Sequence, residues 1–198
     1  MNKTTYNNQS GRSMVEMLGV LAIVAVLSVG GIAGYSKAMA KFKITKTLDQ
    51  VSTLVTDIRS LYSGSPDYAG ISIPNLITYE VIPNDMRVDA GNAKNAFGGP
   101  VLVGAWNGAP AVNNQGFQVV YNGLDRTTCI QLASSDWGGS AASGFVGMDV
   151  AANAGGVTAG TNPTRSWAIA NTLPINLATA AGLCSSDQPT NSIKWTYR

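Results

Sequence analysis

The chain has 198 residues, with 13 Lys and Arg against 11 Asp and Glu and a formal net charge of +2. A balance this close to neutral gives no electrostatic reason to expect nucleic-acid binding. Histidine is absent, and the chain is rich in Gly, Ala, Ser, Thr and Asn, which favours an exported surface protein over an enzyme. The length suits one domain together with an extended helix.

The N-terminal region combines a short polar segment with a long apolar one. Residues 1–11 carry a single charge, Lys3, and too few apolar side chains to contribute to a core, which predicts a removable leader. Residues 17–36 carry no charge at all. As a helix these twenty residues extend roughly 30 Å, the thickness of a bilayer core, so they predict a membrane span.

Glu16 lies at the N-terminal end of this span, where a carboxylate costs free energy unless a cation pairs with it. The stretch Gly11-Arg12-Ser13-Met14-Val15-Glu16 resembles the processing site of type IV prepilins, in which a polar leader ends in Gly and Glu is the fifth residue after it. The resemblance implies cleavage between Gly11 and Arg12 by a prepilin peptidase, methylation of the new N-terminus, and polymerisation of the helix into a filament core. Arg12 departs from the apolar residue that is more usual at that position.

Two features after the span leave alternatives open. Ala38-Met39-Ala40 fits a secretory cleavage site, which would make the mature chain start at Lys41. In addition, four lysines follow the span and only Lys3 and Arg12 precede it, so the positive-inside rule favours the opposite orientation. We nevertheless expect residues 63–198 on the periplasmic side of an inner membrane, because of the prepilin resemblance and because a cysteine pair suits an oxidising compartment.

Glycines interrupt the span, and Gly30-Gly31 is its weakest point, since each Gly lowers helix stability by up to about 1 kcal/mol relative to Ala. One interpretation is that the helix bends or partly melts there when subunits pack into a fibre. The other is that small residues allow close helix packing.

An amphipathic pattern continues from the span to residue 62. Apolar residues step by three or four along one helical face: Ile44, Leu48, Val51, Val55, Ile58 and Tyr62. Lys43, Lys46, Asp49, Gln50 and Arg59 fall largely off this face. The pattern predicts one helix from about Ser13 to Tyr62, in which residues 12–36 form the membrane or filament-core half and residues 37–62 the half that packs on a globular head.

The head, residues 63–198, shows short elements. Helical segments are expected at Pro74–Tyr79, after Asp125 and at Ile175–Leu183, and strands at Val101–Val103, Phe117–Tyr121, Phe145–Val150, Trp167–Ile169 and Ile193–Tyr197. Alternation predicts that Phe117–Tyr121 is half-buried. The Gly-rich stretch 137–164 is expected at the surface.

The block from Phe117 through Asn122-Gly123-Leu124 to Cys129 is similar to type IVb pilins such as the toxin-coregulated pilin. The two cysteines, Cys129 and Cys184, are too few for a structural zinc site. A long-range disulfide is the simplest interpretation, with two buried free thiols as the alternative. In the family the enclosed region, here 129–184, forms much of the filament surface, so subunit contacts are expected there.

The sequence therefore predicts an α+β pilin in which the long N-terminal helix packs on an antiparallel sheet. The expected function is that of a structural pilus subunit with no catalytic, metal or cofactor site, serving adhesion, aggregation or conjugation. Its expected partners are other copies of the chain, the prepilin peptidase, an inner-membrane assembly platform and membrane lipid. Glu16 is expected to pair with the N-terminal amine of an adjacent copy, and Arg12 adds a second cation there. The alternatives are a pseudopilin of a type II secretion system and a membrane-anchored binding domain that does not polymerise.

Overall fold

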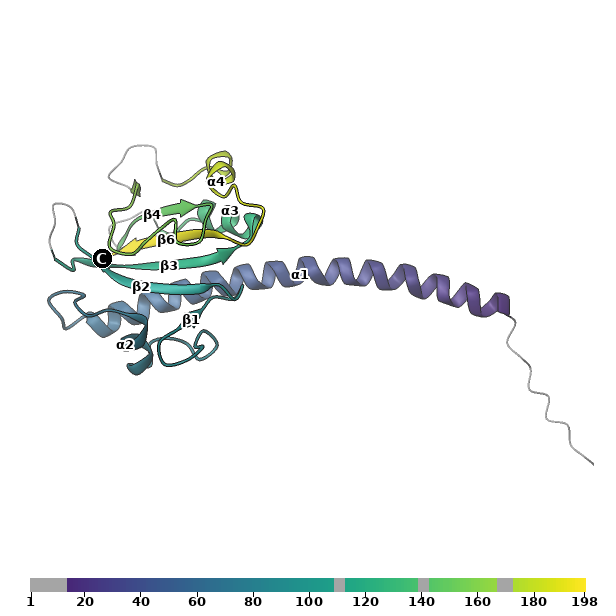
Figure 1. The fold of residues 1–198 in the computed structure, drawn as a ribbon, viewed down its shortest axis with the longest axis horizontal. Helices are drawn as coiled ribbons and strands as arrows, with labels where there is room; N and C mark the ends of the chain where they lie inside the picture. Colours follow the sequence, from purple (N-terminus) through teal and green to yellow (C-terminus); the bar gives the residue numbers. More distant parts are fainter. Residues whose placement is uncertain (1–13, 109–112, 139–142, 167–172) are drawn as a thin grey trace, which may run out of the picture. The chain divides into compact units, whose positions relative to one another are not determined.

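The computed structural model describes residues 14–108, 113–138, 143–166 and 173–198 (Figure 1). The chain forms two compact units, which divide between Lys41 and Phe42. The elements are α1 (Met14–Tyr62), α2 (Ile73–Thr78), β1 (Ala93–Lys94), β2 (Pro100–Trp106), β3 (Gly116–Leu124), α3 (Arg126–Ser134), β4 (Phe145–Ala151), β5 (Arg165–Ser166), α4 (Leu177–Leu183) and β6 (Asn191–Tyr197). The cleavage site at Gly11 and Arg12 and the strand expected at Trp167–Ile169 lie outside the described residues.

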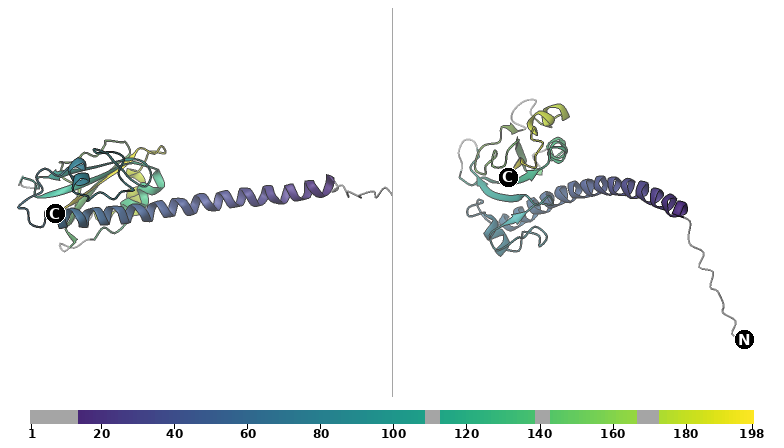
Figure 2. Two further views of the ribbon diagram at one scale, coloured as in Figure 1. Left: turned by 90° about the horizontal axis from the view of Figure 1, so that it is seen from below. Right: turned by 45° about the vertical axis from the view of Figure 1, so that its right-hand side comes forward.

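Helix α1 begins within one residue of its predicted start and ends at Tyr62 as predicted. It runs unbroken along its length (Figure 2), and Gly30 and Gly31 lie within it. A Cβ atom added at either glycine would meet nothing within 4 Å. Bending or partial melting of the helix at Gly30-Gly31 therefore stays a prediction about the assembled state.

The C-terminal part of α1 packs on the head through the predicted face. Val51, Val55 and Ile58 are buried, and Leu54 joins them, while Ile44, Leu48 and Tyr62 pack against the core at its margin. This burial of apolar surface is what stabilises the second half of the helix.

Gln50 corrects the predicted polar face of α1, because its side chain is buried rather than exposed. Its amide donates a 3.0 Å hydrogen bond to the carboxylate of Asp85, which also forms a 2.7 Å ion pair with Lys46. The hydrogen bond from Lys46 is the main reason that the pKa of Asp85 lies below its usual value. A hydrogen bond to a residue 35 positions away thus explains why the side chain of Gln50 is buried.

The described residues of the head form a six-stranded sheet in the order β1-β2-β3-β6-β4-β5. Every pairing is antiparallel, which confirms the predicted sheet. The last strand in sequence, β6, lies in the middle, where Trp195 is the register partner of Val119 on β3 and of Met148 on β4. One face of the sheet carries these residues and forms the apolar core.

The other face of the sheet is covered as well, which corrects the prediction that Phe117–Tyr121 is half-buried. Strand β3 is not half-buried, because Gln118 and Val120 on its second face are fully buried. The cover comes from the Gly-rich segment expected at the surface: the backbone N–H of Gly160 donates to the Gln118 side chain, and that side chain donates to the carbonyl of Thr161, both at 2.6 Å. The segment's own backbone thus completes a second, polar layer.

A buried ion pair lies at the centre of this polar layer. Lys194 on β6 and Asp149 on β4 are register partners, and their charged atoms are 2.7 Å apart with side chains only 1% and 9% exposed. Lys194 also donates to the carbonyls of Thr158 and Thr161, and Asp149 accepts from the backbone N–H of Thr164. The pair therefore fastens the covering segment to the two adjacent strands.

Replacing Lys194 with Met should destabilise the head strongly, because Asp149 would remain buried without its cation. Loss of one partner of a buried pair costs about 3–5 kcal/mol. Denaturant unfolding of the detergent-solubilised chain measures the loss, and Lys194→Met/Asp149→Asn should recover part of it. The matched control is Arg126→Met, which breaks the exposed 2.9 Å pair with Asp187 and should cost no more than about 1 kcal/mol. Equal losses in the two single variants would contradict the role of the buried pair.

Candidate assembly surfaces

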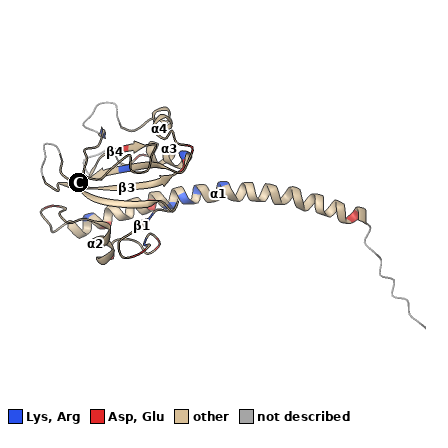
Figure 3. Cartoon of the chain, viewed as in Figure 1, with Lys and Arg blue, Asp and Glu red and all other residues tan. Residues whose placement is uncertain are grey.

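The N-terminal part of α1 presents an apolar surface on all sides. Its large apolar side chains, from Met14 to Tyr35, are between 51% and 86% exposed, and the buried residues of α1 begin only at Thr47. Figure 3 shows this stretch without charge between the acid near its start and the lysines that follow. Among the described residues, α1 is the one helix long and apolar enough to cross a membrane. Such a surface requires hydrocarbon or other apolar helices around it.

Glu16 lies in the first turn of α1. A carboxylate there interacts favourably with the helix dipole, but no cation of the described residues forms an ion pair with it. Arg12, its predicted companion, lies outside the described residues. Glu16 is therefore a carboxylate on an otherwise apolar part of the helix, and it has no ion-pair partner among the described residues.

The disulfide between Cys129 and Cys184 is present, which excludes the alternative of two free thiols. It joins the middle of α3 to the C-terminal end of α4. Asp125 caps the first helix by accepting from the N–H of Thr128, and Asn176 caps the second by accepting from the N–H of Thr179. The bridge encloses the buried strand β4 as well as exposed segments, so only part of region 129–184 is available for contacts between subunits.

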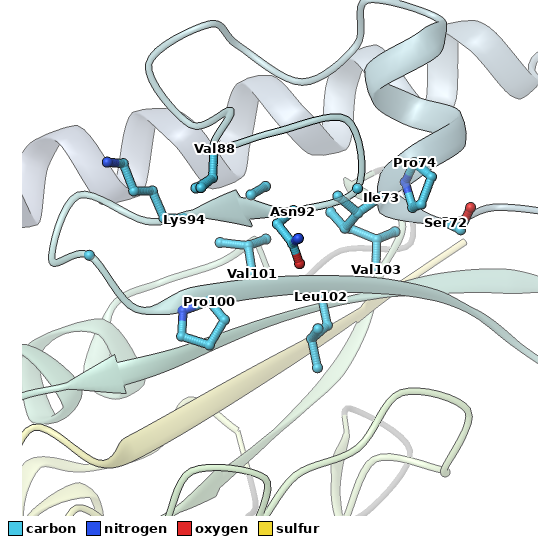
Figure 4. Close-up of a pocket in the computed structure, with 13 residues that line it drawn as sticks. Ser72, Ile73, Pro74, Val88, Asn92, Lys94, Pro100, Val101, Leu102 and Val103 are labelled. Carbon is cyan, nitrogen blue, oxygen red and sulfur yellow. The ribbon is translucent and has the colours of Figure 1, made fainter.

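A groove of about 540 Å³ lies between α2 and the β1–β2 edge of the sheet (Figure 4). Ile73, Pro74 and Val103 gather at one end, and Val88 and Lys94 lie at the other. Val88 is 57% exposed. This groove was not predicted from the sequence, because its walls come from segments that only the fold brings together.

An exposed apolar side chain projects near the opposite edge of the sheet. Leu177, the first residue of α4, is 65% exposed, and Ala178 beside it is also exposed. Helix α4 contacts α3 and β4, whereas the groove borders β1 and β2 at the other end of the strand order. The head therefore offers an apolar hollow and an apolar projection on different sides.

Comparisons with known proteins identify the family. A family model described as PilS N terminal matches residues 41–198. The chain belongs to this family. Over 191 residues it is 28% identical to the major structural subunit of the bundle-forming pilus of Escherichia coli O111:H-, covering 94% of this chain and 93% of that protein. The subunit of the same name from Escherichia coli O127:H6 (strain E2348/69 / EPEC) matches to the same extent.

Two solved structures share the fold. The type IVb pilin of Salmonella typhi has a TM-score of 0.54 at 20% identity, covering 77% of this chain and 97% of its own. TcpA, a type IV pilin from Vibrio cholerae El Tor biotype, has a TM-score of 0.54 at 13% identity, covering 79% and 99%.

The family and the shared fold confirm the predicted type IVb pilin and its α+β architecture. The relatives are structural proteins and not enzymes, which confirms the prediction of a non-catalytic chain. The roles of Gly11 and Arg12 in processing and of Glu16 in assembly stay predictions.

Removing the disulfide should lower the stability of the head. The bridge closes a loop of 55 residues, for which chain-entropy models give a stabilisation of about 4 kcal/mol. Cys129→Ser/Cys184→Ser should therefore unfold at lower denaturant concentration than the oxidised wild type. Adding a reductant is the matched control, because it should shift the wild type and leave the double variant unchanged. Identical midpoints for the oxidised wild type and the variant would show that the bridge does not stabilise the head.

Proposed function

We propose that the chain is a structural subunit of a type IVb pilus, which polymerises with other copies of itself into an extracellular filament. The observation that supports this most directly is the match to the bundle-forming pilus subunit along 94% of the chain. The apolar half of α1, exposed on all sides, has the surface that such a polymer would bury. Adhesion, aggregation and conjugation are all compatible with this role.

The proposed route begins with a precursor in the inner membrane whose residues 63–198 form a periplasmic head. Residues 1–11 are the leader, and the prepilin peptidase cleaves between Gly11 and Arg12, after which the new N-terminus is methylated. Residues 12–36 then lie in the bilayer, with residues 37–62 linking them to the head. An assembly platform in the inner membrane transfers each subunit from lipid into the fibre. The support for this route is the uncharged stretch between Glu16 and Lys37 within a continuous helix.

Glu16 is proposed to set the axial register of the fibre. Cleavage places a positively charged amine four residues before Glu16, so each subunit carries both charges at the tip of its helix. A carboxylate buried alone in a fibre core costs several kcal/mol, and pairing with the amine of an adjacent copy removes that cost. Arg12 contributes a second cation beside the amine. Apolar contacts hold the helices together but do not fix how far one slides along another.

Gly30 and Gly31 are proposed as the place where α1 adjusts to its neighbours in the fibre. Neither glycine is held by a neighbouring atom within 4 Å of a Cβ position. Two adjacent glycines lower the cost of local unwinding.

The heads are proposed to contact each other through the groove and α4. A contact between two different surfaces of identical subunits is heterologous, and when its rotation does not close a ring it builds an open helical polymer. The groove beside α2 and the projection at Leu177 are such a pair, since both are apolar and they lie at different edges of the sheet. The rest of the exposed part of region 129–184 would face the outside of the filament.

Two other functions share the processed helix: a pseudopilin of a type II secretion system and a membrane-anchored binding domain. The relatives that match most of this chain are pilus subunits, which favours the pilus. No cofactor or metal is proposed.

Replacing Glu16 with Val or Gln should abolish filaments while leaving membrane insertion and leader removal intact, because neither change adds charge to the span. The readouts are the amount of subunit in sheared surface filaments and, separately, its amount in alkaline-extracted membranes. Glu16→Asp, which keeps the charge on a shorter side chain, should retain part of the assembly. Normal filament yield from Glu16→Val would reject the register role.

Replacing Val88 with Asp should reduce filament yield by placing a charge in the groove. Val88→Thr, which keeps the shape and adds no charge, is the matched control and should assemble almost normally. Since Val88 is largely exposed, both variants should unfold close to the wild-type midpoint. A normal filament yield from a stably folded Val88→Asp would remove the groove from the assembly contact.

A further inference from the structure

Four lysines follow the apolar stretch of α1 within ten residues: Lys37, Lys41, Lys43 and Lys46. No Asp or Glu occurs between residues 17 and 48. On a helix only residues three or four apart are neighbours, so the first three lysines have no carboxylate within reach on their own helix. Any carboxylate or phosphate that pairs with them must therefore come from another part of the chain or from another molecule.

The head balances two of these lysines. Lys46 forms the 2.7 Å ion pair with Asp85, and the ammonium of Lys43 lies 5.7 Å from the ring centroid of Phe97. Lys37 and Lys41 are exposed and have no ion pair among the described residues. Lys43 and Lys46 thus contact other residues of the head, whereas Lys37 and Lys41 are exposed.

The position of Lys37 and Lys41 matches the headgroup layer of a bilayer. Lys37 is the first charged residue after the span, and Lys41 lies one turn later, about 6 Å further along the axis. Subtracting the hydrocarbon core from the whole bilayer leaves about 5–8 Å for each headgroup layer. Tyr35 and Phe42, 67% and 62% exposed, flank the two lysines, and aromatic residues commonly lie at this depth.

The charge of the two lysines calls for an anionic neighbour. In the proposed orientation they lie on the side of the membrane that the positive-inside rule disfavours, and an anionic lipid surface would offset part of that cost. The same stretch of a neighbouring copy has no acid either. We propose that Lys37 and Lys41, with Tyr35, bind the phosphate headgroups of anionic phospholipids at the C-terminal end of the span before assembly.

The binding site has a consequence for assembly, and it rests on the proposed function because it needs the membrane-inserted subunit. A subunit that enters the fibre leaves the bilayer, so the lysines must give up their phosphate partners. The lipid contact therefore holds unassembled subunits in the membrane and adds to the work of extraction.

The test uses the full-length chain reconstituted in phosphatidylcholine bilayers that contain a trace of spin-labelled lipid. The spectra give the fraction of labelled lipid immobilised at the protein, once with labelled phosphatidylglycerol and once with labelled phosphatidylcholine. The wild type should prefer phosphatidylglycerol at least about threefold, and high salt should weaken the preference. Lys37→Gln/Lys41→Gln should reduce the ratio to about one. The matched control, Arg126→Gln/Arg165→Gln, removes the same charge from the head and should keep the wild-type ratio.

The possible results distinguish failure of the lipid site from failure of the proposed pilus function. Resistance to alkaline extraction reports insertion for every variant. An inserted wild type without lipid preference, or a preference that survives Lys37→Gln/Lys41→Gln, would overturn the lipid site and leave the pilus function standing. If that double variant keeps the preference but forms no filaments, the lysines pair with an acid of a neighbouring subunit instead. A wild type that fails to insert would overturn both proposals.

Discussion

Water cannot surround residues 17–36 of this chain in any stable state. Each large apolar side chain gains about 1.5–3 kcal/mol when it leaves water, and the apolar half of α1 is exposed on every side in a single copy. Lipid tails and the side chains of neighbouring helices are similarly apolar, so exchanging one for the other changes little hydrophobic free energy. Polar groups must therefore decide when and where a subunit leaves the membrane. In the proposed fibre this role falls to Glu16, and in the bilayer to Lys37 and Lys41.

The head meets a different requirement, because it must hold its shape with few large apolar residues on one face of its sheet. Polar contacts do much of the work there. The last strand, β6, joins the two halves of the sheet, and Lys194 on that strand connects Asp149 to the segment that covers the second face. The disulfide links α3 and α4 beside this sheet. The exposed surfaces of the head are thus supported by a sheet in which the buried charges of Lys194 and Asp149 are paired with each other.

Local patterns predicted the helices and the antiparallel sheet well. The periodic apolar residues predicted the limits of α1, and the strand patterns located β3 and β6. The same patterns gave the wrong exposure for residues whose partners are distant in the sequence. Lys194 and Gln118 lie at positions that alternation assigns to solvent, yet both are buried because the segment 152–164 supplies carbonyl and N–H groups to them. Nothing in the Gly-rich composition of that segment reveals which strand it covers.

The candidate sites divide in the same way. Glu16 and the cysteine pair were evident from sequence, since a lone acid beside a long apolar run and two distant cysteines are unusual in themselves. The groove at Val88 was not, because α2, β1 and β2 meet only in the fold. The sequence did show the excess of lysines after the span, but only the contacts of Lys43 and Lys46 with the head separated Lys37 and Lys41 from them.

This chain is proposed to lose its leader and to polymerise through the exposed helix. Intact mass together with N-terminal sequencing of sheared surface filaments tests both parts at once. We expect filaments built of a polypeptide that begins at a methylated Arg12 and retains the Cys129–Cys184 disulfide. Filaments that lack this polypeptide, or that contain it beginning at Met1 or at Lys41, would exclude the proposed processing and polymerisation.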